Sequence, residues 1–165
     1  MRAGSFNLPP ADGHFIAERM VRKFKTYSSK MQFTRAFADF PASVQLGVTG
    51  DACMHPGEVP ALLYFRAEDT WVLLTSLRVV YTTETGVLCT FLTRVQTVEA
   101  PGRFKAPGYD LLVLVMDAWR RPEIHVEPGA AHIAFWNSLL VGLRILSRPP
   151  ASTQSPADGE AKKTP

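Results

Sequence analysis

Residues 71–83 of the chain read WVLLTSLRVVYTT, and this stretch decides the fold. Its β-branched and aromatic residues favour extended backbone. Ser76 and Leu77 leave room only for a tight connection, so we place two strands at 71–75 and 78–83. The stretch therefore predicts an antiparallel hairpin rather than a helix.

Short apolar runs of the same kind lie on both sides of this hairpin, separated by Gly, Pro and acidic residues. They predict strands at 59–66, 87–98, 109–116 and 123–127, an edge strand at 44–49, and a loop at 50–57. A C-terminal helix is predicted at 130–146 from one apolar face, which comprises Ile133, Trp136, Leu140 and Leu143. The expected fold class is α+β, mainly β: a partly open antiparallel barrel of about seven strands, capped by this helix.

The residues before Pro41 are typical of helices. A first helix is predicted at 12–29, with Asp12 as its N-cap, from apolar residues at helical spacing: Ile16, Met20, Phe24 and Tyr27. A second helix, ending at Pro41, is predicted from the spacing of Phe33, Phe37 and Phe40. The predicted organisation is an N-terminal helical appendage at 1–41, a β-rich domain at 42–148, and a disordered polar tail at 149–165.

Three pieces of the chain resemble bacterial pleckstrin-homology-like (PH-like) domains. They are residues 71–81, the tripeptide Pro56-Gly57-Glu58 before the first core strand, and residues 91–98, which read FLTRVQTV. The resemblance covers about residues 44–147 and implies a PH-like barrel. It also implies a scaffold that hosts peptide, protein or lipid binding without a shared catalytic apparatus.

Charge and composition exclude several classes of protein. The 165 residues carry a net charge of only +3, and residues 1–40 hold seven Lys or Arg against three Asp or Glu. Nucleic-acid binding normally needs a much stronger basic face, so no nucleic-acid partner is expected. The first ten residues lack the basic and apolar regions of a secretory signal, and two unrelated cysteines suggest no disulfide framework. A cytoplasmic location is therefore predicted.

Few residues suggest catalysis. Cys53, His55 and Glu58 could in principle form a nucleophile with a base, or a metal site. No further ligand with recognisable spacing accompanies them, and Cys89 within a strand suggests a small buried hydrophobic residue. No phosphate-binding or hydrolase motif is found. We expect no enzyme, no cofactor and no metal.

Lipid recognition through the first hairpin loop is also disfavoured. Residues 66–70 read RAEDT, and the two carboxylates would repel a phosphorylated headgroup. Arg120 and Arg121 form a basic pair in a later loop, which we interpret as an ordinary solvated loop.

The sequence favours a non-catalytic protein-interaction module, such as an immunity, inhibitor or adaptor protein, that binds an unidentified protein or a second copy of itself. The N-terminal helices or an exposed sheet edge would make the contact, by helix-in-groove binding or by β-augmentation. The alternative is peripheral binding to an anionic membrane through the basic N-terminal helix. The candidate binding residues are Arg19, Arg22, Lys23, Phe24, Phe33 and Phe37.

Overall fold

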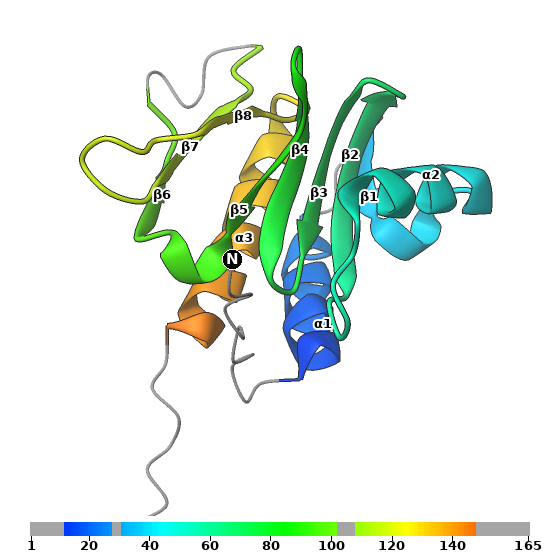
Figure 1. Cartoon of the computed structure of the whole chain (residues 1–165), viewed down its shortest axis with the longest axis horizontal. Coiled ribbons are helices and arrows are strands. Elements are labelled where there is room, and N and C mark those ends of the chain that lie inside the picture. Colours follow the sequence, from blue (N-terminus) through cyan, green and yellow to red (C-terminus); the bar gives the residue numbers. More distant parts are fainter. Residues whose placement is uncertain (1–11, 28–30, 102–107, 148–165) are drawn as a thin grey trace, which may run out of the picture.

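The computed structural model describes residues 12–27, 31–101 and 108–147. Within these ranges, eight strands form two antiparallel sheets that three α-helices cover (Figure 1). The α+β, mainly β class is confirmed. The sheets stay separate, so the described residues form no closed barrel. The predicted tail at 149–165 and the end of the first predicted helix, 28–29, lie outside the described residues.

The larger sheet contains the hairpin predicted at residues 71–83. Its five strands follow chain order: β1 (Thr34–Ala36), β2 (Pro60–Ala67), β3 (Thr70–Thr75), β4 (Arg78–Thr83) and β5 (Gly86–Phe91). In the β3–β4 hairpin, Val72 lies opposite Tyr81 and Leu74 opposite Val79. The strands predicted at 71–75 and 78–83 are confirmed.

The smaller sheet consists of β6 (Thr97–Glu99), β7 (Leu111–Val115) and β8 (Glu123–His125). The single strand predicted at 87–98 is wrong, because the 3-10 turn η2 (Leu92–Arg94) separates β5 from β6. Leu92 is buried in this turn, and its backbone N–H donates to the Leu77 carbonyl. Burying Leu92 thus bends the chain out of one sheet and into the other.

Two helices close the main core. Helix α1 (Gly13–Phe24) is capped by Asp12, whose side chain accepts a hydrogen bond from the His14 backbone N–H, and it packs on α3 (Ala130–Leu146). Gly142 lies at this contact, where a Cβ atom would collide with the Met20 side chain. The core combines the α1 face that includes Ile16 and Met20 with side chains of both sheets and α3. The apolar face of helix α1 is therefore part of the same core as the β-sheets.

A second core covers the opposite face of the larger sheet. Helix α2 (Ala42–Ala52) packs there, apart from the other two helices (Figure 1). Alternate strand residues divide between the cores, since Leu62 and Leu74 face the first while Leu63 and Leu73 face the second. The central strands are consequently buried on both faces, which explains their nearly continuous apolar sequences.

The edge strand predicted at 44–49 is wrong, because these residues belong to α2. Val44, Val48 and Ala52 recur every four residues and turn one helical face toward the sheet. The Gln45 side-chain amide donates to the Phe40 carbonyl, which closes the first turn. Packing on the sheet thus outweighs the β-propensity of the two valines.

The helix predicted over residues 33–40 is also wrong. The chain forms β1 and a 3-10 turn, η1 (Phe37–Asp39). The Glu127 carboxylate accepts hydrogen bonds from the backbone N–H groups of Gln32 and Phe33, at 2.6 and 2.9 Å. Arg35 then lies opposite Leu63 in an antiparallel ladder. A carboxylate 94 residues further along the chain therefore helps hold this segment extended.

A buried ion pair joins α2 to the β3–β4 hairpin. Arg78 binds both carboxylate oxygens of Glu58, with its Nε 2.8 Å from Oε1 and its Nη2 3.0 Å from Oε2. The same Nη2 donates to the carbonyls of Ala52 and Cys53 at the end of α2. Both side chains are almost fully buried, at 6% and 0% exposure. Thr75 adds a hydroxyl that donates to Glu58 Oε1 at 2.6 Å.

These contacts change the pKa of both Glu58 and Arg78. Burial alone would raise the pKa of Glu58, but hydrogen bonds from Arg78, the His55 backbone and Thr75 outweigh it and hold this pKa below its usual value. For Arg78, burial acts to lower the pKa, and the bonds to Glu58 reverse that effect. Both groups are therefore charged in the folded protein near neutral pH.

We predict that Arg78→Met lowers the free energy of unfolding by about 3–5 kcal/mol, because it leaves the Glu58 carboxylate buried without its cation. Urea denaturation measures the loss. The control is Arg121→Met, which breaks an exposed ion pair with Glu99 and should cost less than about 1 kcal/mol. Arg78→Lys keeps the positive charge but loses the planar guanidinium that binds both carboxylate oxygens. Its loss of stability should therefore lie between those of the other two variants. Equal losses for Arg78→Met and Arg121→Met would contradict this ranking.

The ion pair also predicts a pH dependence. Because the folded pKa of Glu58 lies below the unfolded value of about 4.3, the carboxylate stabilises the fold above that value and loses its effect as the pH falls through the folded pKa. The stability difference between the native chain and Glu58→Gln should be largest near pH ~7 and shrink below pH ~4. Urea titrations across this range test it, and a constant difference would show that Glu58 does not carry the dependence.

Candidate interaction surface

The basic residues predicted as a binding site lie on the outward side of α1. Arg19 and Arg22 are exposed, and Lys23 is half-buried. The Arg19 guanidinium carbon stands 5.2 Å from the centre of the Phe15 ring, and the Lys23 ammonium 5.5 Å from the centre of the Tyr27 ring. These three cations therefore share one solvent-facing helix surface.

The predicted aromatic residues do not join them. Phe24 is only 7% exposed and belongs to the main core, on which Phe33 also packs. Phe37 is buried in the second core, on the other face of the larger sheet. The structure thus distributes the three rings between two interiors and forms no exposed aromatic patch from them.

The residues considered for catalysis have different roles in the structure. Glu58 is bound by Arg78 and Thr75, while Cys53 is exposed and ends α2 with a φ of 48°. The expectation that Cys89 is buried is wrong, since it lies exposed on β5. Among the residues that the structure describes, no group of three His, Cys, Asp or Glu is placed so that it could hold a metal ion.

Among the residues that the structure describes, β5 forms an open edge of the larger sheet. It pairs with β4, and no described strand pairs with its other side, because the chain leaves the sheet through η2. Alternate residues of an edge strand direct their backbone N–H and C=O groups away from the sheet, where another strand can bind them. Val87 and Leu88 on this strand are 40% and 49% exposed. The edge therefore offers both backbone groups and apolar side chains.

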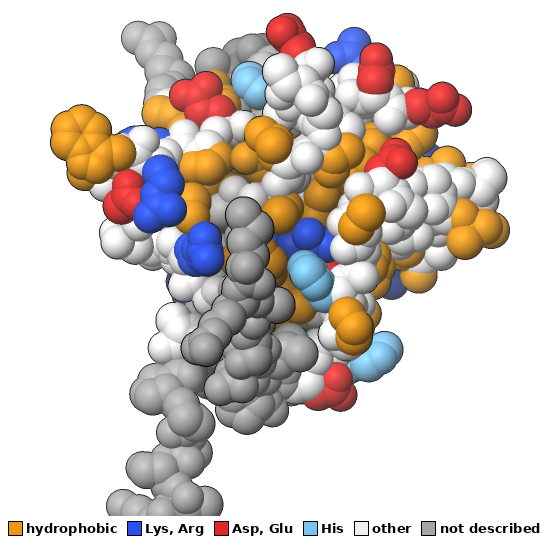
Figure 2. Space-filling view, in the orientation of Figure 1, with side chains coloured by type: hydrophobic (Ala, Val, Ile, Leu, Met, Phe, Trp, Pro, Cys, Tyr) orange, Lys and Arg blue, Asp and Glu red, His pale blue; other side chains and the backbone are white. Residues whose placement is uncertain are grey.

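A groove of about 420 Å³ lies between β5 and the β7–β8 loop, residues 116–122. Apolar groups from both sides line it, including Leu88, Phe91, Met116 and Pro122. Figure 2 shows hydrophobic side chains on this face of the molecule, with basic side chains gathered toward the loop. The groove exists because the two sheets do not close into a barrel.

Three arginines line the same groove. Arg120 pairs with Asp117 at 2.6 Å and Arg121 with Glu99 at 2.5 Å. Both ion pairs are exposed, so each contributes little to stability. A carboxylate of a partner can therefore replace Asp117 or Glu99. No ion pair of Arg94 is found among the residues that the structure describes. The groove can therefore accept carboxylates from a partner.

The side chain of Trp119, in the β7–β8 loop, is exposed to solvent. Asp117 accepts hydrogen bonds from the backbone N–H groups of Trp119 and Arg120, at 2.9 and 2.8 Å, which closes a tight turn. The bond from Trp119, with smaller contributions from Arg120, lowers the pKa of Asp117 below its usual value. Trp119 is 94% exposed. The bonds fix the backbone of the turn and leave the indole exposed, and tryptophan is among the residue types enriched at protein interfaces.

This surface was not predicted from the sequence. Arg120 and Arg121 were interpreted as a solvated loop, and the single strand predicted at 87–98 hid the edge of β5. The neighbouring Trp119 was the available signal, because tryptophan is enriched at protein interfaces.

Comparison with known protein families, with curated proteins and with solved structures gives no match for this chain. Among the described residues, no helix has the length and apolar character needed to cross a membrane.

The difference in burial between Phe24 and Arg22 leads to a prediction about stability. Phe24→Ala should lower the free energy of unfolding by about 3–5 kcal/mol, because it leaves a cavity in the main core. Arg22→Ala should change it by less than about 0.5 kcal/mol, since the side chain is exposed. Chemical denaturation measures both. A Phe24→Ala variant as stable as the native chain would mean that Phe24 does not serve the core.

Proposed function

We propose that this chain is a non-catalytic protein-interaction module that binds an extended, acidic segment of a partner protein along the open edge of β5. The segment would pair with β5 and place its carboxylates on Arg94, Arg120 and Arg121. The single observation that carries the proposal is the groove beside β5, in which an unpaired strand edge, exposed apolar side chains and arginines coincide.

The strand edge supports binding by β-augmentation. In that mode, main-chain hydrogen bonds supply affinity, and alternate side chains of the added strand supply specificity. An exposed edge with apolar side chains is otherwise a liability for aggregation, which proteins usually block. Leu88 and the neighbouring Val87 leave this edge unblocked.

The charges support an acidic partner. A carboxylate that meets an arginine forms a short, often bidentate hydrogen bond, and it would replace the exposed pairs of Arg120 and Arg121. A second copy of the chain would instead bring its own arginines to the same edge. The charge pattern therefore favours a different, acidic protein over self-association.

The element order supports a PH-like scaffold for this module. Seven consecutive strands, β2 to β8, form the two sheets together with β1, and α3 follows them. On such a scaffold the chain would act as an adaptor, or as an inhibitor of the immunity-protein type, by covering its partner's segment.

The membrane alternative has less support. The apolar face of α1, including Ile16 and Met20, is buried in the main core, so inserting it into lipid would remove it from that core. Arg19, Arg22 and Lys23 could still touch an anionic surface electrostatically.

The test is a peptide-display selection on the full chain, followed by affinity measurements with the enriched peptides. We expect peptides in which acidic and apolar residues alternate, with binding that weakens as salt increases. Leu88→Glu and Arg94→Glu should each weaken binding by about tenfold or more, because each places a carboxylate in the groove that repels an acidic peptide.

Two control variants match these changes on other surfaces. Leu46→Glu places the same charge on an exposed leucine of α2, and Arg144→Glu reverses an exposed arginine of α3. Both should bind as the native chain does. Selected peptides without acidic residues, or equal losses in the controls, would refute the proposal. Co-sedimentation with phosphatidylserine vesicles that is lost in Arg19→Glu/Arg22→Glu, with no peptide selected, would favour the membrane instead.

A further inference from the structure

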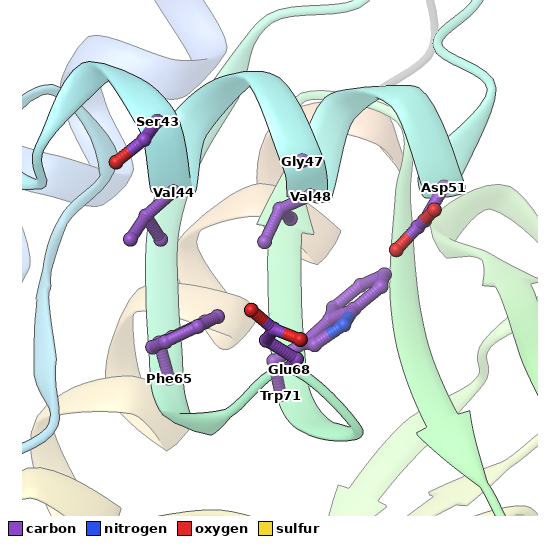
Figure 3. Close-up of a pocket in the computed structure, with 8 residues that line it drawn as sticks. All are labelled: Ser43, Val44, Gly47, Val48, Asp51, Phe65, Glu68 and Trp71. Carbon is purple, nitrogen blue, oxygen red and sulfur yellow. The ribbon is translucent and has the colours of Figure 1, made fainter.

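A second groove lies on the opposite face of the larger sheet, between α2 and the β2–β3 hairpin. Its volume is about 250 Å³, and Figure 3 shows the eight residues that line it. This is below the roughly 300–1,000 Å³ of a drug-sized ligand site. The groove therefore suits one long side chain rather than a whole small molecule.

The walls of the groove are apolar. Val44 and Val48 extend from α2 toward Phe65 and Trp71 on the sheet (Figure 3). Between the valines, Gly47 leaves a notch, because a Cβ atom built on it would meet no other atom within 4 Å. Val48 and Trp71 are almost fully buried, whereas Val44 and Phe65 are half-buried, so an aliphatic stem that lies beside Gly47 would contact Val44 and Phe65.

Two carboxylates stand at the same groove. Asp51, near the end of α2, and Glu68, in the β2–β3 turn, both extend toward the Trp71 side chain (Figure 3). Both are exposed, and no ion pair of either is found among the described residues. The nearest arginine in the sequence, Arg66, interacts with Tyr64, which belongs to the main core on the other face of β2. Arg35 lies on the same face, with its guanidinium over the Phe40 ring, but neither arginine lines the groove, whose charged lining residues are the two carboxylates.

We propose that this groove binds an arginine side chain of a partner protein. The aliphatic stem would lie against Val44 and Phe65, and the guanidinium would reach the exposed carboxylates of Asp51 and Glu68. Arginine suits this site better than lysine, since its planar guanidinium stacks on aromatic rings and pairs with carboxylates through several donors. Phosphates and acidic segments would be repelled here, so this site selects the opposite charge from the β5 groove.

The test uses the full chain and a capped tripeptide, acetyl-Leu-Arg-Leu-amide, followed by NMR. We expect the peptide to shift the indole N–H signal of Trp71 and the amide signal of Gly47. The matched peptide with citrulline, which keeps the shape of arginine but lacks its charge, should bind about fivefold more weakly or worse. Binding to the arginine peptide should also weaken with added salt.

Substitutions in the groove locate the binding. Gly47→Leu fills the notch and should abolish the shifts, whereas Gly50→Leu, an equally open glycine of the same helix outside the groove, should leave them unchanged. Asp51→Asn and Glu68→Gln should each weaken binding about two- to fivefold. Thermal unfolding checks that all four variants fold. If Gly47→Leu does not fold, Glu68→Gln, which lies in an exposed turn, still tests whether the groove binds the peptide.

Three results would overturn the proposal: no shift at Trp71, equal binding of the citrulline peptide, or unchanged binding to Gly47→Leu. The proposal does not depend on the β5 groove, because none of its variants changes a residue of that groove. Loss of acidic-peptide binding at β5 and loss of arginine binding at α2 are therefore separate results.

Discussion

The buried pair of Arg78 and Glu58 is the constraint on which the rest of the structure depends. Arg78 begins β4, yet its side chain reaches the final carbonyls of α2, at Ala52 and Cys53, as well as the Glu58 carboxylate. Thr75 joins the same network from the end of β3. Burying two charges is costly unless nearly every donor and acceptor is satisfied, and here the geometry satisfies them. One guanidinium thus fixes where α2 ends, how residues 53–58 return to the sheet, and where the β3–β4 hairpin turns.

The two-sided burial of the larger sheet explains what could be predicted from the sequence. Residues 71–83 are apolar on both faces, so their strands and their tight connection were predictable from composition and length alone. The C-terminal helix was predictable from its apolar spacing, but its buried face was not placed correctly. Ile133, Trp136 and Leu140 are only partly buried, whereas Phe135 and Leu139 are fully buried. The second layer was not predictable, since α2 carries two valines and two glycines that suggest a strand and a loop. Only its packing on Leu63 and Leu73 makes it a helix.

The missed parts of the candidate site depend on contacts between distant residues. Glu127 holds the backbone of Phe33 extended, and no local pattern around Phe33 reveals a carboxylate 94 residues away. The open edge of β5 depends on the turn at Leu92, whose side chain is buried in the main core and whose backbone N–H donates to the Leu77 carbonyl. Conversely, the basic residues of α1 were correctly placed on its outer side, because helical periodicity is a local property. Its apolar side was predictable as a docking face, but what it docks on was not.

The central ion pair also connects the two grooves physically. Arg78 holds the end of α2, which carries Asp51, and its guanidinium carbon lies 5.9 Å from the centre of the Phe91 ring, which lines the groove beside β5. A hydrophobic pair of similar size could hold α2 to the sheet at equal or lower cost. It could not also bind two helix carbonyls in a fixed direction, since apolar contacts are not directional. We therefore interpret the pair as a positioning element: it fixes α2, with its groove, relative to the β5 edge of the same sheet. A partner that engages both would then meet an acidic and a basic site in a fixed spatial relation.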